Sequence, residues 1–91
     1  MSQTRSQIFR FDHSRGDVEA VLRDLAHYAL LHAHGSSFTF RNLRRDPPFS
    51  ADCEIDTLGL LVEFSGDCSR FEGNLVMALT DSFGTVSVED V

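Results

Sequence analysis

The stretch Thr57-Leu58-Gly59-Leu60-Leu61-Val62-Glu63-Phe64 decides the fold that we expect for this chain of 91 residues. Its apolar positions alternate with the others at Leu58, Leu60, Val62 and Phe64. Alternation with a period of two is typical of a β-strand that buries one face. We therefore predict a strand over residues 57–64, with Leu61 and Glu63 on its outer face.

Shorter segments on both sides of this strand alternate in the same way. They are residues 7–13, 37–43 and 85–88. The first places Phe9 and Phe11 on its inner face, and the second does the same with Phe38 and Phe40. Each of these segments is predicted to be a strand that packs its apolar face on a common core.

Residues 44–52 are predicted to form a loop, because the consecutive prolines Pro47 and Pro48 have no amide donors for a β-ladder. Cys53 and Ile55 either extend the strand of residues 57–64 or form a short extra strand beside it. The proline pair thus separates two of the predicted strands.

Two segments have the helical period instead. Apolar residues recur at steps of three and four over residues 17–34, which predicts an amphipathic helix. The same pattern predicts a second helix over residues 69–83. The start of the second helix has capping-box spacing at Ser69 and Glu72, and Asp67 competes with Ser69 for the role of N-cap.

The element order is therefore β-α-β-β-α-β, within a single compact domain that spans residues 1–91. With right-handed crossovers, this order closes most simply as a four-stranded antiparallel sheet with both helices on one face. It resembles the split-βαβ, or ferredoxin-like, arrangement in element order alone. Because this α+β fold hosts many unrelated functions, the resemblance implies no activity. The residues expected to form one core are Leu22, Leu25, Phe38, Phe40, Leu60, Val62, Leu75 and Leu79.

Charge is distributed unevenly along the chain. The whole chain has eight basic residues, all of them Arg, against fourteen acidic ones, for a net charge of −6. Residues 1–46 have a net charge of +2, whereas residues 47–91 have a net charge of −8. An acidic half of this kind repels phosphate backbones, so we expect no nucleic-acid binding. It attracts a basic protein surface instead, although the acids are equally consistent with a role in solubility alone.

Sequence patterns for membranes, RNA and secretion are also missing. Apolar runs such as Leu60-Leu61-Val62 are far shorter than the roughly 20 residues of a membrane span. Residues 1–7 lack the apolar segment of a secretory signal, so we expect a cytoplasmic protein without membrane contact. Residues 61–64 match half of the third strand of an RNA-recognition motif, but Gly59 and Leu61 replace its stacking aromatic residues.

The residues that commonly carry catalysis or metals lack the spacing that such sites need. The candidates are His13, His27, His32, His34, Cys53 and Cys68. None of them forms a close Cys or His pair of the kind that binds zinc, and His32 is expected at the edge of the core. Cys68 precedes a helix whose dipole lowers a thiol pKa, but the nearby acids raise it, and a buried core position is favoured. No nucleophile elbow or phosphate-binding glycine motif is present. We expect no enzymatic activity, no cofactor and no metal.

The predicted interaction site follows from alternation. Asp52, Glu54 and Asp56 fall on one side of an extended segment, while Cys53 and Ile55 fall on the other. With Glu63 and Leu61 on the neighbouring strand, the three acids are our predicted partner-binding residues. Leu61 is expected to join Ile8 in an apolar patch.

A weaker, basic site is predicted at Arg41, Arg44 and Arg45, the one cluster of cations in the sequence. Guanidinium groups bind phosphates or the acids of a partner. The alternative is a solvated loop in which these residues pair with Asp46.

These features favour a small acidic, non-enzymatic protein-binding domain of the inhibitor or adaptor type. Immunity proteins, antitoxins and phage anti-defence proteins work in this way, by covering the surface of another protein, here one that is basic. The alternative is a small-molecule-sensing or assembly module, a homodimer in which two sheets pair edge to edge and a ligand lies at the seam.

Overall fold

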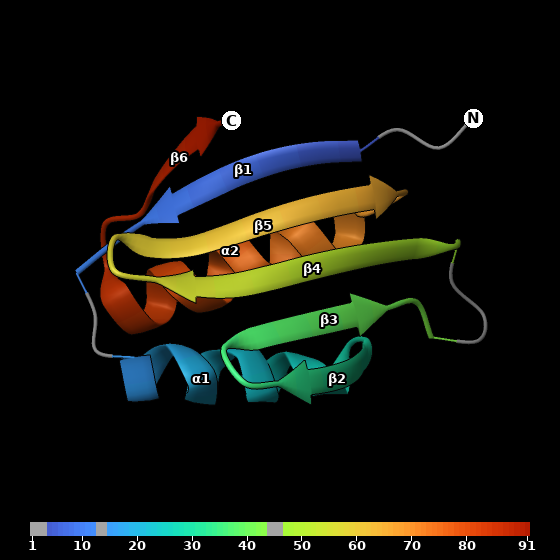
Figure 1. The fold of residues 1–91 in the computed structure, drawn as a ribbon, viewed down its shortest axis with the longest axis horizontal. Helices are drawn as coiled ribbons and strands as arrows, with labels where there is room; N and C mark the ends of the chain where they lie inside the picture. The colour runs from blue at the N-terminus through green and yellow to red at the C-terminus, as the bar shows by residue number, and fades with distance from the viewer. Residues whose placement is uncertain (1–3, 13–14, 44–46) are drawn as a thin grey trace.

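The structure, a computed structural model, describes residues 4–12, 15–43 and 47–91 (Figure 1). Its strands are β1 (Thr4–Arg10), β2 (Leu30–His34), β3 (Ser37–Arg41), β4 (Phe49–Asp56), β5 (Gly59–Gly66) and β6 (Ser87–Asp90). Its helices are α1 (Arg15–Asp24) and α2 (Ser69–Phe83), and a single 3-10 turn, η1 (Leu25–His27), follows α1. Within the described ranges, no helix is both long and apolar enough to cross a membrane.

All six strands belong to one antiparallel sheet in the order β2-β3-β4-β5-β1-β6. Strands β2 to β5 form a meander in which each strand pairs with the next one along the chain. The first strand, β1, lies between β5 and β6. Helix α2, which lies behind β5 and β4, connects these two neighbours of β1 along the chain (Figure 1). Both helices lie on the same side of the sheet, and the molecule is therefore a two-layer α+β domain.

The sheet has six strands and not the predicted four, and the ferredoxin-like order is not confirmed. The first additional strand is β2, which the sequence analysis assigned to the end of a helix over residues 17–34. Helix α1 ends at Asp24 instead, and β2 pairs with β3 across the two-residue turn Gly35-Ser36. Gly35 has a φ of 62°, and a glycine in this first turn position is typical of a tight hairpin.

The second additional strand is β4. A loop was predicted over residues 44–52, and a short extra strand at Cys53 and Ile55 was one of the two predicted alternatives for the residues that follow. The proline pair does interrupt the sheet, but the strand begins directly after it, at Phe49. The alternation was recognised in the sequence over residues 52–56, where Asp52, Glu54 and Asp56 fall on one side and Cys53 and Ile55 on the other. A tight turn at Thr57-Leu58 connects β4 to β5, so Leu58 is 53% exposed and does not face the core as predicted.

The remaining elements lie close to their predicted places. Helix α2 spans residues 69–83 as predicted, while β1 and β6 are shifted by two to three residues from theirs. Helix α2 has Cys68 as its N-cap, and the side chain of that residue does not cap the helix. Asp67 contributes to this end, because its Oδ1 accepts hydrogen bonds from the Ser69 hydroxyl at 2.8 Å and the Ser69 amide at 3.5 Å.

The core lies between the inner face of the sheet and the two helices. All eight residues predicted for it are buried, and they are joined by Phe9, Val18, Phe64 and Phe71, among others. Aromatic rings connect the layers, since Phe40 of β3 packs on Phe71 of α2 with ring centroids 4.8 Å apart. At the rim, the Arg5 guanidinium lies 5.1 Å from the Phe64 ring centroid and pairs with Glu72 of α2 at 2.9 Å.

Replacement of Leu60 by Asp tests the position of β5 in this core. Leu60 is fully buried, and an unpaired carboxylate cannot be buried there without a large loss of stability. We expect Leu60→Asp to abolish the cooperative thermal transition. Leu58→Asp, the same change at the exposed leucine two residues away, is expected to keep it, and a sharp transition in Leu60→Asp would show that β5 is not central.

Two glycines provide a second test of the backbone. A Cβ at Gly59, where φ is 149°, would lie 1.9 Å from the carbonyl oxygen of Phe9 on β1, whereas a Cβ at Gly73 of α2 meets nothing within 4 Å. We expect Gly59→Ala to destabilise the protein by more than about 1 kcal/mol. Gly73→Ala is expected to stabilise it by about 0.5–1 kcal/mol. Chemical denaturation of both variants measures the difference, and equal effects would contradict the described approach of β5 to β1.

Candidate functional site: the open face of the sheet

The side of the sheet opposite the helices is called here the open face (Figure 1). The strand register places its outward side chains in rows that run across the strands. The central row consists of His32, Thr39, Asp52, Glu63 and Ser6. The next row consists of His34, Ser37, Glu54, Leu61, Ile8 and Glu89. Residues from all six strands therefore contribute to one continuous surface.

Three carboxylates meet at the centre of this face, and we call Asp52, Glu54 and Glu63 the acidic cluster. Asp52 of β4 lies directly opposite Glu63 of β5, and both side chains are exposed. The hydroxyl of Thr39 donates a hydrogen bond of 2.9 Å to Asp52 Oδ1 from the other side. Like charges directly opposite each other destabilise a β-ladder, so folding alone does not favour this pair.

A shallow depression of about 340 Å³ lies over the acidic cluster and is also lined by Thr39 and Leu61. Leu61 and Ile8 are directly opposed on β5 and β1, and each is half-buried. In their row, this apolar pair has Glu54 on one side and Glu89 on the other. The open face thus combines a small apolar centre with flanking carboxylates.

The predicted partner-binding residues do not all lie at this centre. The structure brings Asp52, Glu54, Glu63 and Leu61 together. Asp56 lies at the end of β4, where its Oδ1 accepts a 2.7 Å hydrogen bond from the Thr57 amide in the hairpin turn.

Cations lie at the margins of the open face. Arg10 pairs with Glu89, with 3.2 Å between its Nη2 and Oε2 of the carboxylate. Arg41 is exposed on β3, where it lies across from Leu30 and Ser50. The other two members of the predicted basic cluster, Arg44 and Arg45, lie outside the described residues, so the part of the chain that the structure describes contains only Arg41 of this cluster.

Two histidines of the open face were missed by the sequence analysis. His32 and His34 are exposed on β2, and His32 does not lie at the edge of the core as predicted. The sequence did contain a signal for a strand here, because Leu31 and Ala33 alternate with the two histidines. It was outweighed by a helical pattern that runs through the same residues.

The histidines and cysteines are the described residues that sequence patterns single out for metal binding or nucleophilic chemistry. In these ranges, no three His, Cys, Asp or Glu side chains are grouped so that they could hold a metal ion. Cys53 and Cys68 are free and buried, and burial raises the pKa of both thiols. The Cys68 thiol also donates to the carbonyl oxygens of Ser50 and Ser65, at 3.4 and 3.3 Å. Both thiols are therefore neutral at physiological pH and poor nucleophiles.

Comparisons with protein-family models, with curated proteins and with solved structures find no match to this chain. Its function is therefore argued from the geometry and charge of its surfaces.

The burial of Cys53 and Cys68 makes a prediction about reactivity. Because only the thiolate reacts, we expect an aromatic disulfide reagent to modify the folded protein much more slowly than the protein in urea. Unfolded thiols ionise near a pH of about 8.5, and the folded pKa values are higher. The folded state thus holds these protons more tightly, so the free energy of unfolding is expected to fall as the pH rises above about 8.5. Rapid modification of either thiol under native conditions would contradict this description.

Proposed function

We propose that this domain is a non-enzymatic protein-binding module of the inhibitor or adaptor type, which covers a basic surface of a partner protein with its open face. The observation that carries the proposal is the opposed pair Asp52 and Glu63 at the centre of that face. Two exposed carboxylates in direct opposition weaken the sheet, and a cationic partner removes their repulsion. Binding of a cationic partner thus removes a repulsion between carboxylates that lowers the stability of the isolated domain.

The size of the open face also supports this proposal. The molecule measures 34 × 25 × 23 Å, and the sheet is seen face-on along the shortest of these dimensions (Figure 1). The outline of 34 by 25 Å is an upper bound for the open face, and it is of the same order as the roughly 800 Å² that each partner contributes to a standard protein interface.

The composition of the face fits such an interface. Interfaces combine an apolar centre, which supplies affinity, with a polar rim, which supplies specificity. Leu61 and Ile8 provide the apolar centre, and Glu54 and Glu63 lie next to it. The net charge of −6 adds long-range attraction, which accelerates the encounter with a basic partner.

Site-specific crosslinking in the cells of origin identifies the partner and the face together. A photoreactive amino acid at position 61 places the probe at the centre of the open face. The matched control carries it in place of Met77, which is exposed on α2 in the other layer. We expect a protein with a basic surface to be captured from position 61 and not from position 77.

Charge neutralisation then tests the mechanism of association. The variant Asp52→Asn/Glu63→Gln removes two charges from the open face, and Asp24→Asn/Asp81→Asn removes two exposed charges from the helical layer. We expect the first variant to associate with the captured partner more slowly and with a weaker salt dependence, while dissociation changes less. The second is expected to behave like the wild type. Equal association rates for all three proteins at low salt would mean that the carboxylates do not steer binding.

A second candidate function is assembly through a sheet edge, and strand β2 favours it. The two edges of the sheet differ, because β6 carries Glu89 and Asp90 whereas β2 carries Leu30, which is 60% exposed. Repulsion between acids disfavours the pairing of two β6 edges, while an exposed leucine favours the pairing of two β2 edges. Sedimentation of the wild type and of Leu30→Lys separates the two candidate functions. If two β2 edges pair, the wild type is a homodimer and Leu30→Lys is a monomer, whereas binding through the open face leaves the oligomeric state unchanged by this substitution.

A further inference from the structure

The apolar residues at the centre of the open face form a narrow stripe without a cover. Within the described ranges, both helices lie on the other side of the sheet, so no element of the chain covers this face (Figure 1). Leu61 and Ile8 are directly opposed on β5 and β1 and are half-buried, and we call this pair the apolar stripe. The outward positions before and after the pair on the same two strands are occupied by Gly59, Glu63, Ser6 and Arg10. The stripe is therefore one row wide and runs across the strands.

Negative charge is concentrated at one end of the apolar stripe. At the β4 end, Glu54 of the acidic cluster lies directly opposite Leu61, and the other two carboxylates of the cluster occupy the adjacent row. At the β6 end, Glu89 lies opposite Ile8, but its carboxylate is paired with Arg10 at 3.2 Å. A partner that complements this surface therefore carries an apolar row with its cations at the β4 end.

A single helix fits a stripe of this shape better than a sheet or a second copy of the domain. A sheet presents apolar side chains in several parallel rows, most of which would meet polar residues of the open face. Two copies packed face to face would oppose surfaces of the same negative charge, in a chain whose net charge is −6. An amphipathic helix presents one narrow apolar row with polar residues on both sides, and this arrangement matches the stripe.

The spacing of the row also matches a helix. Neighbouring strands lie about 4.8 Å apart, so the row from Glu54 through Leu61 to Ile8 spans roughly 10 Å. Helix residues i, i+4 and i+7 span about 10.5 Å along the axis, because each residue adds about 1.5 Å. A helix that lies along this row can place a cation over Glu54 and two apolar side chains over the stripe. Its N-terminal end is the positive end of the helix dipole and favours the acidic end of the row.

We propose that the open face binds a basic amphipathic helix of the partner, which lies across β4, β5 and β1 with its N-terminal end over the acidic cluster. This inference rests on the proposed function and specifies the element of the partner that makes the contact. The apolar side of the helix packs on Leu61 and Ile8 and removes them from water. Arginines in its first turn donate charge-assisted hydrogen bonds to the carboxylates of the acidic cluster. The sheet then has helices on both faces.

A synthetic helical peptide of about 18 residues tests this inference without the natural partner. The probe consists of alanine and glutamine, with two arginines in its first turn and leucines four and seven residues after the first arginine. In one control peptide, glutamates replace the arginines. In the other, both leucines are moved to the opposite side of the helix. A hydrocarbon staple away from these positions keeps all three peptides helical.

Amide NMR spectra locate the binding site of the probe, and calorimetry measures its affinity. We expect saturable binding, with shifts centred on the outward residues of β4, β5 and β1. Both control peptides are expected to bind at least about tenfold more weakly, because one repels the acidic cluster and the other leaves the apolar stripe exposed. A spin label at the N-terminus of the probe is expected to broaden signals of β4, and one at its C-terminus signals of β1 and β6.

Protein variants separate the apolar and the charged contribution. Leu61→Gln is expected to weaken binding of the probe at least about tenfold, whereas Leu58→Gln, the same change at the exposed leucine of the hairpin turn, is expected to leave it unchanged. Glu54→Gln is expected to weaken binding, and Asp81→Asn, which removes one exposed charge from the helical layer, is not. Thermal unfolding of each variant confirms that it is folded.

Three results would overturn the inference. They are the absence of saturable binding at millimolar probe, equal affinities for the probe and the glutamate peptide, and an unchanged affinity in folded Leu61→Gln. If any of these is found while a basic protein is captured from position 61, the proposed function stands and only the helix is rejected. If no protein is captured from position 61 either, the proposed function is rejected with it.

Discussion

The register in which β4 pairs with β5 is the constraint on which the rest of the structure depends. In this register, Ala51 and Cys53 face the core together with Phe64 and Val62, which they oppose. A shift by one residue would turn every side chain of β4 to the other face and bury Asp52 among the phenylalanine rings. The apolar inner positions of the two strands thus determine that the acidic cluster lies on the open face. Helix α2 covers the other, apolar face.

Some elements of this structure were predicted from the sequence and others were not. Helix α2 and the eight core residues were predicted correctly, because the spacing of the apolar residues in these segments fits only one kind of secondary structure. Strand β2 was missed, whereas β4 was predicted only in part, as one of two alternatives for Cys53 and Ile55. In β2, the helical and the alternating pattern overlap, and pairing with Phe38 and Phe40 of β3 decides in favour of the strand. In β4, the proline pair led to a predicted loop as far as residue 52, whereas the strand begins directly after the prolines, at Phe49.

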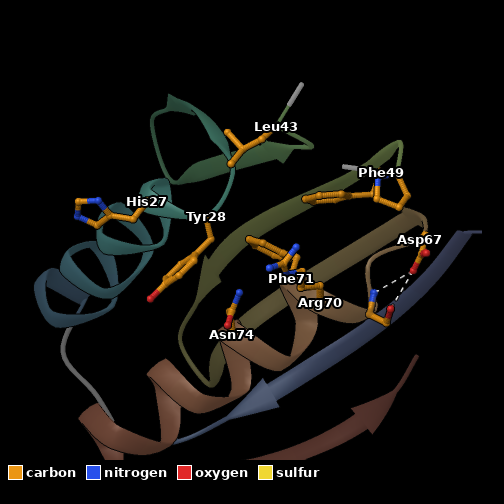
Figure 2. Close-up of a pocket in the computed structure, with 10 residues that line it drawn as sticks. His27, Tyr28, Leu43, Phe49, Asp67, Arg70, Phe71 and Asn74 are labelled. Carbon is orange, nitrogen blue, oxygen red and sulfur yellow. Dashed lines mark hydrogen bonds between the residues drawn. The ribbon is translucent and has the colours of Figure 1, made fainter. Parts of the chain in front are cut away.

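The candidate sites were predictable to different degrees. The acidic cluster followed from alternation, which holds in a sheet of any strand order, so its members lie together although the predicted topology differs from the structure. His32 and His34 joined this face only once β2 was known. A cavity of about 360 Å³ between η1 and the first turns of α2 has no local signal in the sequence, because Tyr28, Phe49 and Phe71 line it from separate elements (Figure 2). A site made by tertiary packing of this kind is visible only in the folded chain.

The central claim is that the opposed carboxylates Asp52 and Glu63 of the open face lower the stability of the fold and serve binding instead. Chemical denaturation of Asp52→Asn/Glu63→Gln at low and high salt tests this claim most directly. The side-chain amide introduced by Asp52→Asn keeps an oxygen acceptor for the Thr39 hydroxyl, so the substitution removes the repulsion with little other change. We predict that the variant is more stable than the wild type by up to about 1 kcal/mol at low salt, and that the difference shrinks as salt screens the charges. A variant that is less stable at low salt would show that these carboxylates serve the fold itself, and would remove the main support for an acidic binding face.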